Sequence, residues 1–258
     1  MNLKLVESEP GATSMGGRLP IVAIDGPAGA GKSTAARLLA FQIGFTLIDT
    51  GALYRTLALN AFERGVELKD GPGLAKLCNE LRFQFGTLER PTHKGQVASP
   101  EDPTHIPKLH IFCNGVEVTD AIRSPELGMA ASNVSKLPEV REALLQVQRD
   151  FGSHGGIVME GRDIGTVIFP MAELKFFLTA SVESRARRRC DELKGQGVEV
   201  RIEQVIVETK QRDEQDMGRA AAPLKQASDA VLIDSTSKSL EQVVTEMATL
   251  VRNWVKRE

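Results

Sequence analysis

One run of residues, GPAGAGKST at positions 26–34, restricts the fold of this chain more than any other feature of the sequence. It follows the apolar run PIVAID (residues 20–25), which is typical of a buried strand, and it precedes apolar residues at helical spacing from Ala35 to Ile43. Strand, loop and helix in this order match the phosphate-binding loop G-x-x-x-x-G-K-[ST], in which backbone N–H groups surround a phosphate at a helix N-terminus. The chain is therefore expected to bind a nucleoside triphosphate.

The motif also assigns individual roles. We expect the nucleotide to lie against Gly26, Pro27, Ala28, Gly29, Ala30, Gly31, Lys32, Ser33 and Thr34. Lys32 is a mobile charge that can follow the transferred γ-phosphoryl group, and Ser33 can hold Mg²⁺. The loop does not by itself determine the reaction. The sequence has no N-K-x-D motif for reading guanine, as a GTPase should, whereas an ATPase motor or switch stays an alternative.

Apolar runs of strand length alternate along the chain with segments of helical periodicity. The runs lie at residues 20–25, 45–49, 156–160, 174–179 and 230–234. Short apolar runs separated by helices are typical of a parallel sheet covered on both faces. We therefore predict an α/β fold, with a five-stranded parallel sheet flanked by helices.

Two insertions interrupt this pattern. Residues from about 82 to 122 alternate apolar and polar side chains and contain Asn114-Gly115, a pair typical of a tight hairpin turn. They predict a small antiparallel β insert. Ser181 is expected to cap a very basic helix over residues 182–194, and a second helix is expected from about 201 to 217.

The composition argues against several classes of protein. A net charge of −2 disfavours a generally basic nucleic-acid binder, and 5% aromatic residues disfavour single-strand binding. No apolar run has the length of a membrane span. Cys78, Cys113 and Cys190 form no CxxC pair, which indicates reduced thiols in a cytoplasmic protein. Residues 1–18 lack the apolar core of a signal peptide and are expected to form a flexible N-terminal extension.

Four further segments carry a resemblance to a known family. They are DTGALYR (residues 49–55), residues 122–149, EGRDIGTVIFP (160–170) and QRDEQDMGRAAAPL (211–224). In this order they resemble the signature segments of bacterial cytidylate kinases, and the resemblance covers residues 20–256. It implies the fold of phosphate-loop nucleoside monophosphate kinases. It also implies transfer of the γ-phosphoryl group of ATP to CMP or dCMP, with Mg²⁺.

The same resemblance implies how the chain is organised. Residues 1–18 would precede a single domain, 19–258, whose core comprises residues 19–50, 153–181 and 220–258. Residues 51–152 would form the arm that binds the nucleoside monophosphate, including the β insert, and residues from about 182 to 219 would form a helical lid. The partners implied are small-molecule nucleotides, with no nucleic acid and no membrane, and a monomer is expected.

Together with the motif, the resemblance assigns the residues of the site. Catalytic roles fall to Lys32, Arg162, Arg185, Arg189 and Arg219. The acceptor nucleotide would contact Thr50, Tyr54, Arg55, Ser132, Arg141, Arg162, Asp163, Arg212, Asp216 and Arg219. Ser33 and Glu160 would serve Mg²⁺, with contact through water expected for Glu160.

The acceptor residues can be compared with the chemistry of CMP. Cytosine offers a donor at N4 and acceptors at N3 and O2, so a carboxylate and an arginine suit it, whereas uracil reverses the polarity at N3 and at position 4. The family's pattern gives these two roles to Asp163 and Arg141, with Ser132 beside them. Arg55 and Arg162 would bind the CMP phosphate, and Arg212 and Asp216 would reach the ribose.

Arginine is the residue that this chemistry calls for. The acceptor phosphate has a second pKa of about 6 and is largely a dianion at neutral pH, so it needs no general base. It needs cations that hold two charged phosphates together, which arginine does with a two-pronged fork. Arg185 and Arg189 share a helix face. The resemblance implies that this face covers adenine and the ATP phosphates. Arg187 and Arg188 are more typical of a solvated basic face.

Two alternative functions stay open from the sequence. One is a phosphate-loop kinase for another small acceptor, such as UMP, dTMP or a metabolite alcohol. The other is a nucleotide-gated binding protein that hydrolyses its nucleotide slowly.

Overall fold

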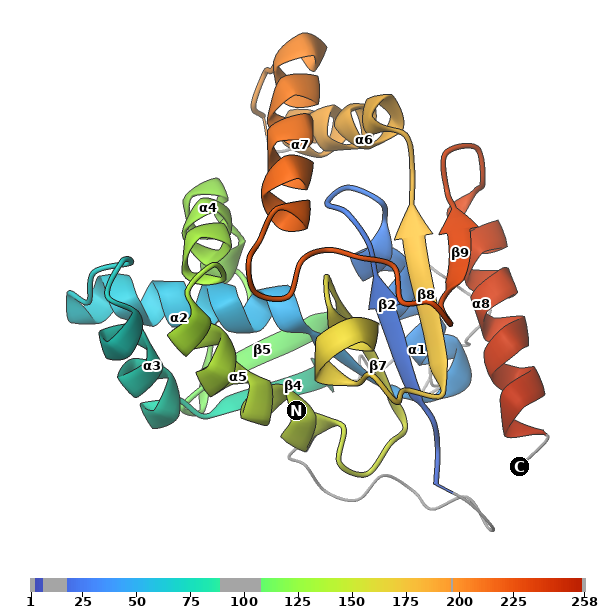
Figure 1. Ribbon diagram of the computed structural model, residues 1–258, viewed down its shortest axis with the longest axis horizontal. Coiled ribbons are helices and arrows are strands. Elements are labelled where there is room, and N and C mark those ends of the chain that lie inside the picture. Colours follow the sequence, from blue (N-terminus) through green and yellow to red (C-terminus); the bar gives the residue numbers. More distant parts are fainter. Residues whose placement is uncertain (1–2, 7–17, 89–107, 196, 257–258) are drawn as a thin grey trace, which may run out of the picture. The chain divides into compact units, whose positions relative to one another are not determined.

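The computed structural model describes residues 3–6, 18–88, 108–195 and 197–256 (Figure 1). Its main sheet has five strands in the order β3-β7-β2-β8-β9. They are β3 (Thr46–Asp49), β7 (Ile157–Gly161), β2 (Ile21–Asp25), β8 (Leu174–Thr179) and β9 (Val231–Asp234). β8 pairs in parallel with both β2 and β9. The predicted α/β class with a five-stranded parallel sheet is confirmed.

The central strand β2 explains why this sheet forms around the phosphate-binding motif. All five of its residues are buried, as the apolar run predicts for a strand covered on both faces. It pairs with β8 from Val22 opposite Leu174 to Asp25 opposite Phe177. The strand ends at Asp25, so the chain leaves the sheet directly into the glycine-rich loop.

The described residues fall into two compact units. The first unit comprises the described residues up to 19 and those from 40 to 157. The second unit comprises residues 20–39 and the described residues from 158 onward.

The second unit contains β2, β8 and β9 and several helices. The helices are the start of α1 (Lys32–Ile43), α6 (Val182–Gly195), α7 (Ile202–Met217) and α8 (Leu240–Val255), with a π-helical turn, η3 (Ile164–Ile168), after β7. The side chain of Ser181 accepts from the Ser184 N–H, as expected for a cap of α6. Of the helices described, none is both long and apolar enough to span a membrane.

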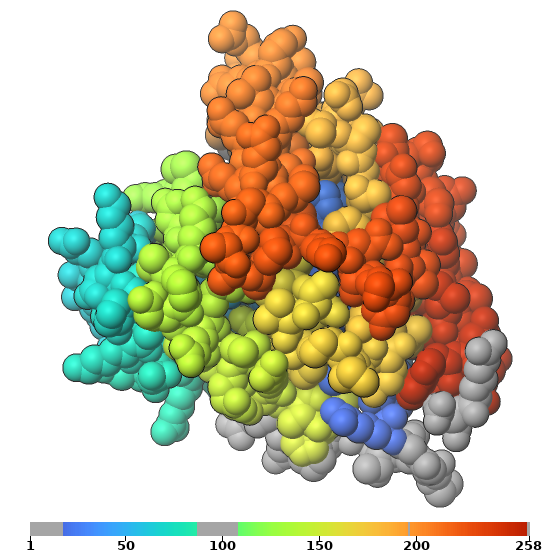
Figure 2. Space-filling model, in the orientation of Figure 1, coloured from blue at the N-terminus to red at the C-terminus, as the bar shows by residue number. Residues whose placement is uncertain are grey.

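Helices α6 and α7 pack against each other through a small apolar cluster. Its buried members are Ala186, Cys190 and Val205. Most of α7 is exposed, as the orange atoms in Figure 2 show, and only Val205, Asp213 and Asp216 of that helix are buried. Two of those three buried residues are acidic, which requires partners for their charges.

The described residues of the first unit include the end of α1, the strand β3, the helices α2 to α5 and an antiparallel sheet. The helices are α2 (Thr50–Arg64), α3 (Gly71–Glu80), α4 (Pro125–Val134) and α5 (Pro138–Phe151), with the short η2 (Ala121–Arg123) before α4. α2 packs against α4, and α3 packs against α5. Asp49, Asp70 and Ser124 cap α2, α3 and α4 with side-chain oxygens.

Three strands of the antiparallel sheet, β4, β5 and β6, lie in the predicted insert. The strand order of the sheet is β1-β4-β5-β6, with β1 (Leu3–Val6), β4 (Phe83–Leu88), β5 (Leu109–Cys113) and β6 (Val116–Glu117). The turn between β5 and β6 is formed by Asn114 and Gly115, with φ values of 51° and 80°. Both lie in the left-handed region that Asn-Gly hairpin turns require, so the predicted hairpin is confirmed. Residues 89–107 of the insert lie outside the described residues.

One part of the predicted N-terminal extension does not hold. Leu3–Val6 form β1, which pairs with β4 from Leu3 opposite Leu88 to Val6 opposite Phe85. An edge strand leaves a row of backbone N–H and C=O groups unpaired, and any extended segment that reaches it can pair with them. The sequence alone did not indicate this pairing. Residues 1, 2 and 7–17 lie outside the described residues.

Candidate active site

The phosphate-binding loop lies between β2 and α1 and is packed tightly against its surroundings. Gly26 has φ 148°, and a Cβ added there would lie 1.9 Å from the carbonyl oxygen of Leu178 in β8. Gly29 has φ 74°, and a Cβ there would lie 3.1 Å from the Cβ of Arg185 in α6. Both positions therefore require glycine, for conformation and for space. The loop is fixed by β8 on one side and by α6 on another.

Lys32 is folded back onto its own loop. Its side chain is 5% exposed, and its Nζ donates to the carbonyl oxygen of Pro27 over 2.7 Å. Burial, together with the Arg162 guanidinium, lowers the pKa of Lys32 to about 7, while Glu160 acts in the opposite direction. The negative charge of an incoming phosphate would favour the protonated form of Lys32 and so raise its pKa.

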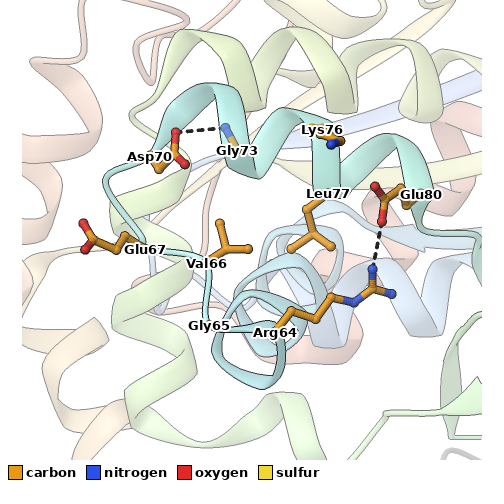
Figure 3. Close-up of a pocket in the computed structure, with 9 residues that line it drawn as sticks. All are labelled: Arg64, Gly65, Val66, Glu67, Asp70, Gly73, Lys76, Leu77 and Glu80. Carbon is orange, nitrogen blue, oxygen red and sulfur yellow. Dashed lines mark hydrogen bonds and ion pairs between the residues drawn. The ribbon is translucent and has the colours of Figure 1, made fainter.

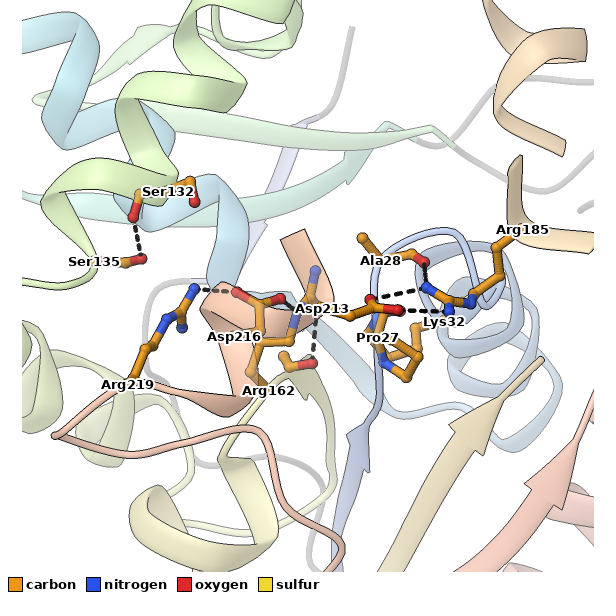
Figure 4. Close-up of polar contacts among 11 residues, drawn as sticks. Pro27, Ala28, Lys32, Ser132, Ser135, Arg162, Arg185, Asp213, Asp216 and Arg219 are labelled. Atoms are coloured by element: carbon orange, nitrogen blue, oxygen red, sulfur yellow. Dashed lines mark hydrogen bonds and ion pairs between the residues drawn. The ribbon is translucent and has the colours of Figure 1, made fainter. Parts of the chain in front are cut away.

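A buried carboxylate holds two of the predicted acceptor arginines. Asp216 is 1% exposed, and one of its oxygens accepts from Arg162 Nε over 2.9 Å. Its other oxygen accepts from Arg219 Nη2 (Figure 4). Burial alone would raise the pKa of Asp216, but the Arg162 and Arg219 guanidinium groups hold this pKa below its ordinary value. Arg162 and Arg219 thus lie on the two oxygens of one carboxylate.

Arg185 makes a buried network at the base of α6. Its Nη1 and Nη2 donate to the two carboxylate oxygens of Asp213 in α7, over 2.9 and 2.6 Å. Its Nε donates to the carbonyl of Ala180, and Nη1 also donates to the carbonyl of Ala28 in the phosphate-binding loop, over 3.2 Å (Figure 4). The predicted catalytic arginine therefore holds the loop's backbone and joins α6 to α7. Asp213, which sequence reasoning missed, completes this network.

The other arginines of α6 do not follow the expected division. Arg189 is exposed and pairs with Glu192 over 3.1 Å. Arg188 does not lie on a solvated face, because it donates to the carbonyl of Ala30 in the phosphate-binding loop. The interpretation of Arg188 as a solvated residue is therefore wrong, whereas Arg187 is exposed as expected. Residues 185 and 188 are three apart and share a helix face as well as 185 and 189 do.

The base-reading candidate Asp163 lies at the start of the π-helical turn. It is 5% exposed, and its carbonyl accepts from the N–H groups of Val167 and Ile168 over 2.9 and 3.2 Å. π-Helical turns are rare and frequently occur at functional sites. Arg212 is exposed on α7, one turn before Asp216.

A second acidic residue, Asp25, holds this turn from the end of β2. Its two carboxylate oxygens accept from the N–H groups of Ile164 and Gly165, each over 2.8 Å. Burial raises the pKa of Asp25 to about 6, against the two backbone hydrogen bonds, and the nearby charge of Asp163 adds to the increase. Sequence reasoning missed Asp25. The only signal for it is an acidic residue at the end of an otherwise apolar run.

This raised pKa predicts how the stability depends on pH. Folding favours the protonated form of Asp25, so its contribution is fully present below the ordinary pKa of 3.8 and is lost as the pH rises through about 6. The loss amounts to at most about 3 kcal/mol of unfolding free energy. The free energy of unfolding, measured by chemical denaturation between pH 4 and 7, should therefore fall with rising pH in the native chain and not in Asp25→Asn. Parallel pH profiles for the two proteins would contradict the assignment.

In the first unit, the DTGALYR segment forms the start of α2. Asp49 caps the helix at the Ala52 N–H over 3.1 Å and pairs with Arg55 over 2.8 Å. The Arg55 Nε is buried and has no hydrogen-bond partner among the described residues. Thr50 is buried and Tyr54 is half-buried on the same helix. Arg55 therefore retains a donor that a bound anion could use.

The other acceptor candidates of this unit lie around the turn between α4 and α5. Arg141 Nη1 donates to the carbonyl of Ser135 over 3.3 Å, and the Ser135 hydroxyl donates to the carbonyl of Ser132 over 2.9 Å. Figure 4 shows the Ser132–Ser135 contact at the end of α4. Ser135 thus links Ser132 to Arg141 across this turn.

The residues proposed for Mg²⁺ fit a site that is completed by phosphates. Ser33 is exposed in the first turn of α1, and Glu160 is 4% exposed near the end of β7. Both offer oxygen, the donor that Mg²⁺ prefers. Within the described residues no three His, Cys, Asp or Glu side chains are grouped to hold a metal ion.

A surface depression in the first unit contains none of the predicted site residues. It has a volume of about 610 Å³ and is lined by the end of α2, the following loop and α3, including Arg64, Asp70 and Glu80 (Figure 3). Arg64 and Glu80 pair across it over 2.9 Å, and both side chains are largely exposed. An exposed pair of this kind contributes less than about 1 kcal/mol of stability. The depression adds no chemistry to the site.

Comparisons with known proteins give one consistent result. A family model described as cytidylate kinase matches residues 22–253. A cytidylate kinase from Citrifermentans bemidjiense is 47% identical over 232 residues, 90% of this chain and 92% of that protein. The cytidylate kinase of Geobacter sulfurreducens is 46% identical over 240 residues, 93% of this chain and 96% of that protein. A cytidylate kinase of Pseudomonas aeruginosa is 48% identical, with the same two coverages, over 239 residues.

Proposed function

This chain belongs to the cytidylate kinase family, and on that premise we propose that it transfers the γ-phosphoryl group of ATP to CMP or dCMP, giving ADP and CDP or dCDP. The observation that carries the proposal is the match of residues 22–253, which include the phosphate-binding loop, to the cytidylate kinase family model. Neither another acceptor nor a slow nucleotide-gated binder is favoured by any of these comparisons.

The donor nucleotide is proposed to occupy the loop at residues 26–34. Backbone N–H groups and Lys32 would hold its phosphates, and the Lys32 amine would leave the Pro27 carbonyl for the transferred group. Ser33 and Glu160 would help to hold Mg²⁺, and the ion would neutralise negative charge on the phosphates of ATP. The acceptor phosphate attacks as a dianion, so the protein has no proton to remove from it.

The acceptor phosphate is proposed to bind between arginines. Arg162 lies close enough to Lys32 to lower the pKa of that lysine, so an acceptor phosphate on Arg162 would lie near the donor loop. Arg219 shares Asp216 with Arg162 and would add a second guanidinium group. Arg55, with its unpaired buried Nε, is proposed to bind the same phosphate. Arg185 and Arg189 are proposed to act on the donor side.

The cytosine base is proposed to be read by Asp163 and Arg141, with Ser132 beside them. A carboxylate can accept from the N4 amino group, and a guanidinium group can donate to N3 and O2. Arg212 and Asp216 would reach the ribose, and Thr50 and Tyr54 would lie along the nucleoside. In this proposal, a carboxylate and a guanidinium group together discriminate against uracil.

The organisation expected from the family is part of the proposal. Residues 51–152 would act as the arm for the nucleoside monophosphate and residues 182–219 as the lid, within one domain. We place the monomeric enzyme in the cytoplasm, which is consistent with three buried, unpaired thiols at Cys78, Cys113 and Cys190.

One assay tests the proposed activity. ADP release is measured with a coupled assay over a panel of monophosphates (CMP, dCMP, UMP, dTMP and AMP), with ATP and with or without Mg²⁺. We expect ADP release that depends on CMP or dCMP and on Mg²⁺. ADP release without any acceptor would identify an ATPase, and a response to another monophosphate alone would identify a different kinase. Either result would overturn the proposal.

A further inference from the structure

Arg188 in α6 contacts the phosphate-binding loop, and the proposed mechanism gives this arginine no role. Arg188 Nη1 donates to the carbonyl of Ala30 over 3.3 Å and to the hydroxyl of Ser235 over 3.1 Å. Its Nη2 donates to the carbonyl of Ser235 over 2.6 Å. A Cβ built on Gly31 would lie 3.8 Å from the same Nη1. Arg188 therefore lies against the loop at the Ala30–Gly31 peptide.

Ser235 supports the same carbonyl from the end of β9. It is 4% exposed, its N–H donates to Thr179 over 2.8 Å, and its hydroxyl lies 3.0 Å from both the Ala30 and the Thr179 carbonyl oxygens. One hydroxyl proton is shared between these two acceptors, while the oxygen accepts from Arg188. Ser235 is thus anchored to the sheet and holds Ala30 in a fixed position.

Because the peptide bond is planar, the contacts of the Ala30 carbonyl also affect the groups that face a bound nucleotide. The Ala30 carbonyl and the Gly31 N–H belong to one planar trans peptide, so they point in opposite directions. Fixing the carbonyl toward Arg188 and Ser235 directs the Gly31 N–H to the other side of the loop. The same geometry applies to Arg185, one turn before Arg188 in α6, which holds the Ala28 carbonyl and so orients the Gly29 N–H. An anion site made of backbone N–H groups depends on such orientation.

We propose that Arg188 and Ser235 are positioning residues for the donor nucleotide, which hold the Ala30–Gly31 peptide so that its N–H faces the bound phosphates. The proposal rests on the proposed function in one respect, namely that the loop binds a triphosphate. It does not require CMP to be the acceptor. Neither side chain has to touch the nucleotide for this role.

Direct binding in the absence of an acceptor tests this proposal. The variants are Arg188→Gln and Ser235→Ala, with Arg187→Gln as the control, because it makes the same charge change one residue away on an exposed side chain. The probes are ATP and inorganic triphosphate, each with Mg²⁺, measured by calorimetry. We expect both variants to bind ATP about tenfold more weakly and inorganic triphosphate weaker by the same factor, with the control within about twofold of the native chain.

Comparison of the two probes separates positioning from direct contact. If Arg188→Gln weakens ATP and leaves inorganic triphosphate unchanged, Arg188 acts on the nucleoside and the proposal is wrong. An equal loss in Arg187→Gln would assign the effect to net charge and would also overturn it. Steady-state kinetics add a second readout, since KM for ATP should rise while KM for CMP stays within about twofold.

A conservative variant keeps the test valid where folding suffers. Arg188→Lys retains the charge but cannot reach Ala30 and both atoms of Ser235 at once, because an ammonium group lacks the planar fork. We expect it to bind inorganic triphosphate as weakly as Arg188→Gln does, at an unchanged melting temperature. Native affinity in Arg188→Lys would show that charge alone suffices. A chain that binds triphosphate normally but fails to phosphorylate CMP would refute the proposed activity and leave this proposal intact.

Discussion

Replacing Lys32 by methionine is expected to lower kcat for CMP by about 10²- to 10³-fold or more at saturating ATP. We propose that this amine follows the transferred phosphoryl group, and a preorganised charge at that position would stabilise the transition state directly. Methionine keeps the buried apolar stem of this 5%-exposed side chain and removes only the charge and the Pro27 contact. Steady-state kinetics with ATP and CMP measure the effect.

The melting temperature is the control for this variant. It should change by only a few degrees, because methionine has a volume similar to that of lysine. Burial has also lowered the pKa of the Lys32 amine to about 7, so the folded state gains little from the charge that is removed. The loss of kcat should then persist well below the melting temperature. Near-normal turnover in a folded Lys32→Met protein would exclude a direct role of this lysine in the transfer.

Asp163→Ala is expected to reduce kcat/KM for CMP far more than for UMP, narrowing the ratio of the two efficiencies by about tenfold or more. The carboxylate can accept from the cytosine N4 amino group but repels the uracil O4, and mismatched polar groups of this kind cost about 1–3 kcal/mol when buried. Asp163 is 5% exposed, so solvent would relieve little of that mismatch. KM for ATP should change little.

Arg141→Ala provides a second test of the same reading. It removes the donor proposed for cytosine N3 and O2, so it should narrow the CMP-to-UMP ratio in the same direction. The main-chain role of Asp163 in the π-helical turn survives in Asp163→Ala, because its carbonyl accepts the Val167 and Ile168 N–H groups. If both variants lower CMP and UMP efficiencies in parallel, other groups read the base.

The parts of the fold that follow local rules were predictable from the sequence. Buried strands read as short apolar runs, the Asn114-Gly115 turn requires left-handed backbone, and the phosphate-binding motif requires a strand before it and a helix after it. Each of these features depends on residues that are neighbours in the chain. β1 was not predictable in this way, since its partner β4 lies about 80 residues further along.

The candidate site shows the same limit in its details. Spacing places Arg185 on a shared face with both Arg188 and Arg189, and only packing against the phosphate-binding loop selects Arg188. Asp25 and Ser235 are similar cases, because their partners lie 139 and 205 residues away in the sequence. Motifs indicated which chemistry to expect, but the residues that hold the motifs in position depend on long-range contacts.

The carboxylate of Asp25 has a consequence for protein engineering. A designer who wished to move the turn proposed to read the base, residues 163–168, into another phosphate-loop kinase would have to move Asp25 with it, although Asp25 belongs to β2. A recipient without an acid at the end of that strand would leave two buried amides without acceptors, at a cost of about 1–3 kcal/mol each. This turn therefore cannot be transplanted by itself. The smallest transferable unit is the turn together with the last residue of β2.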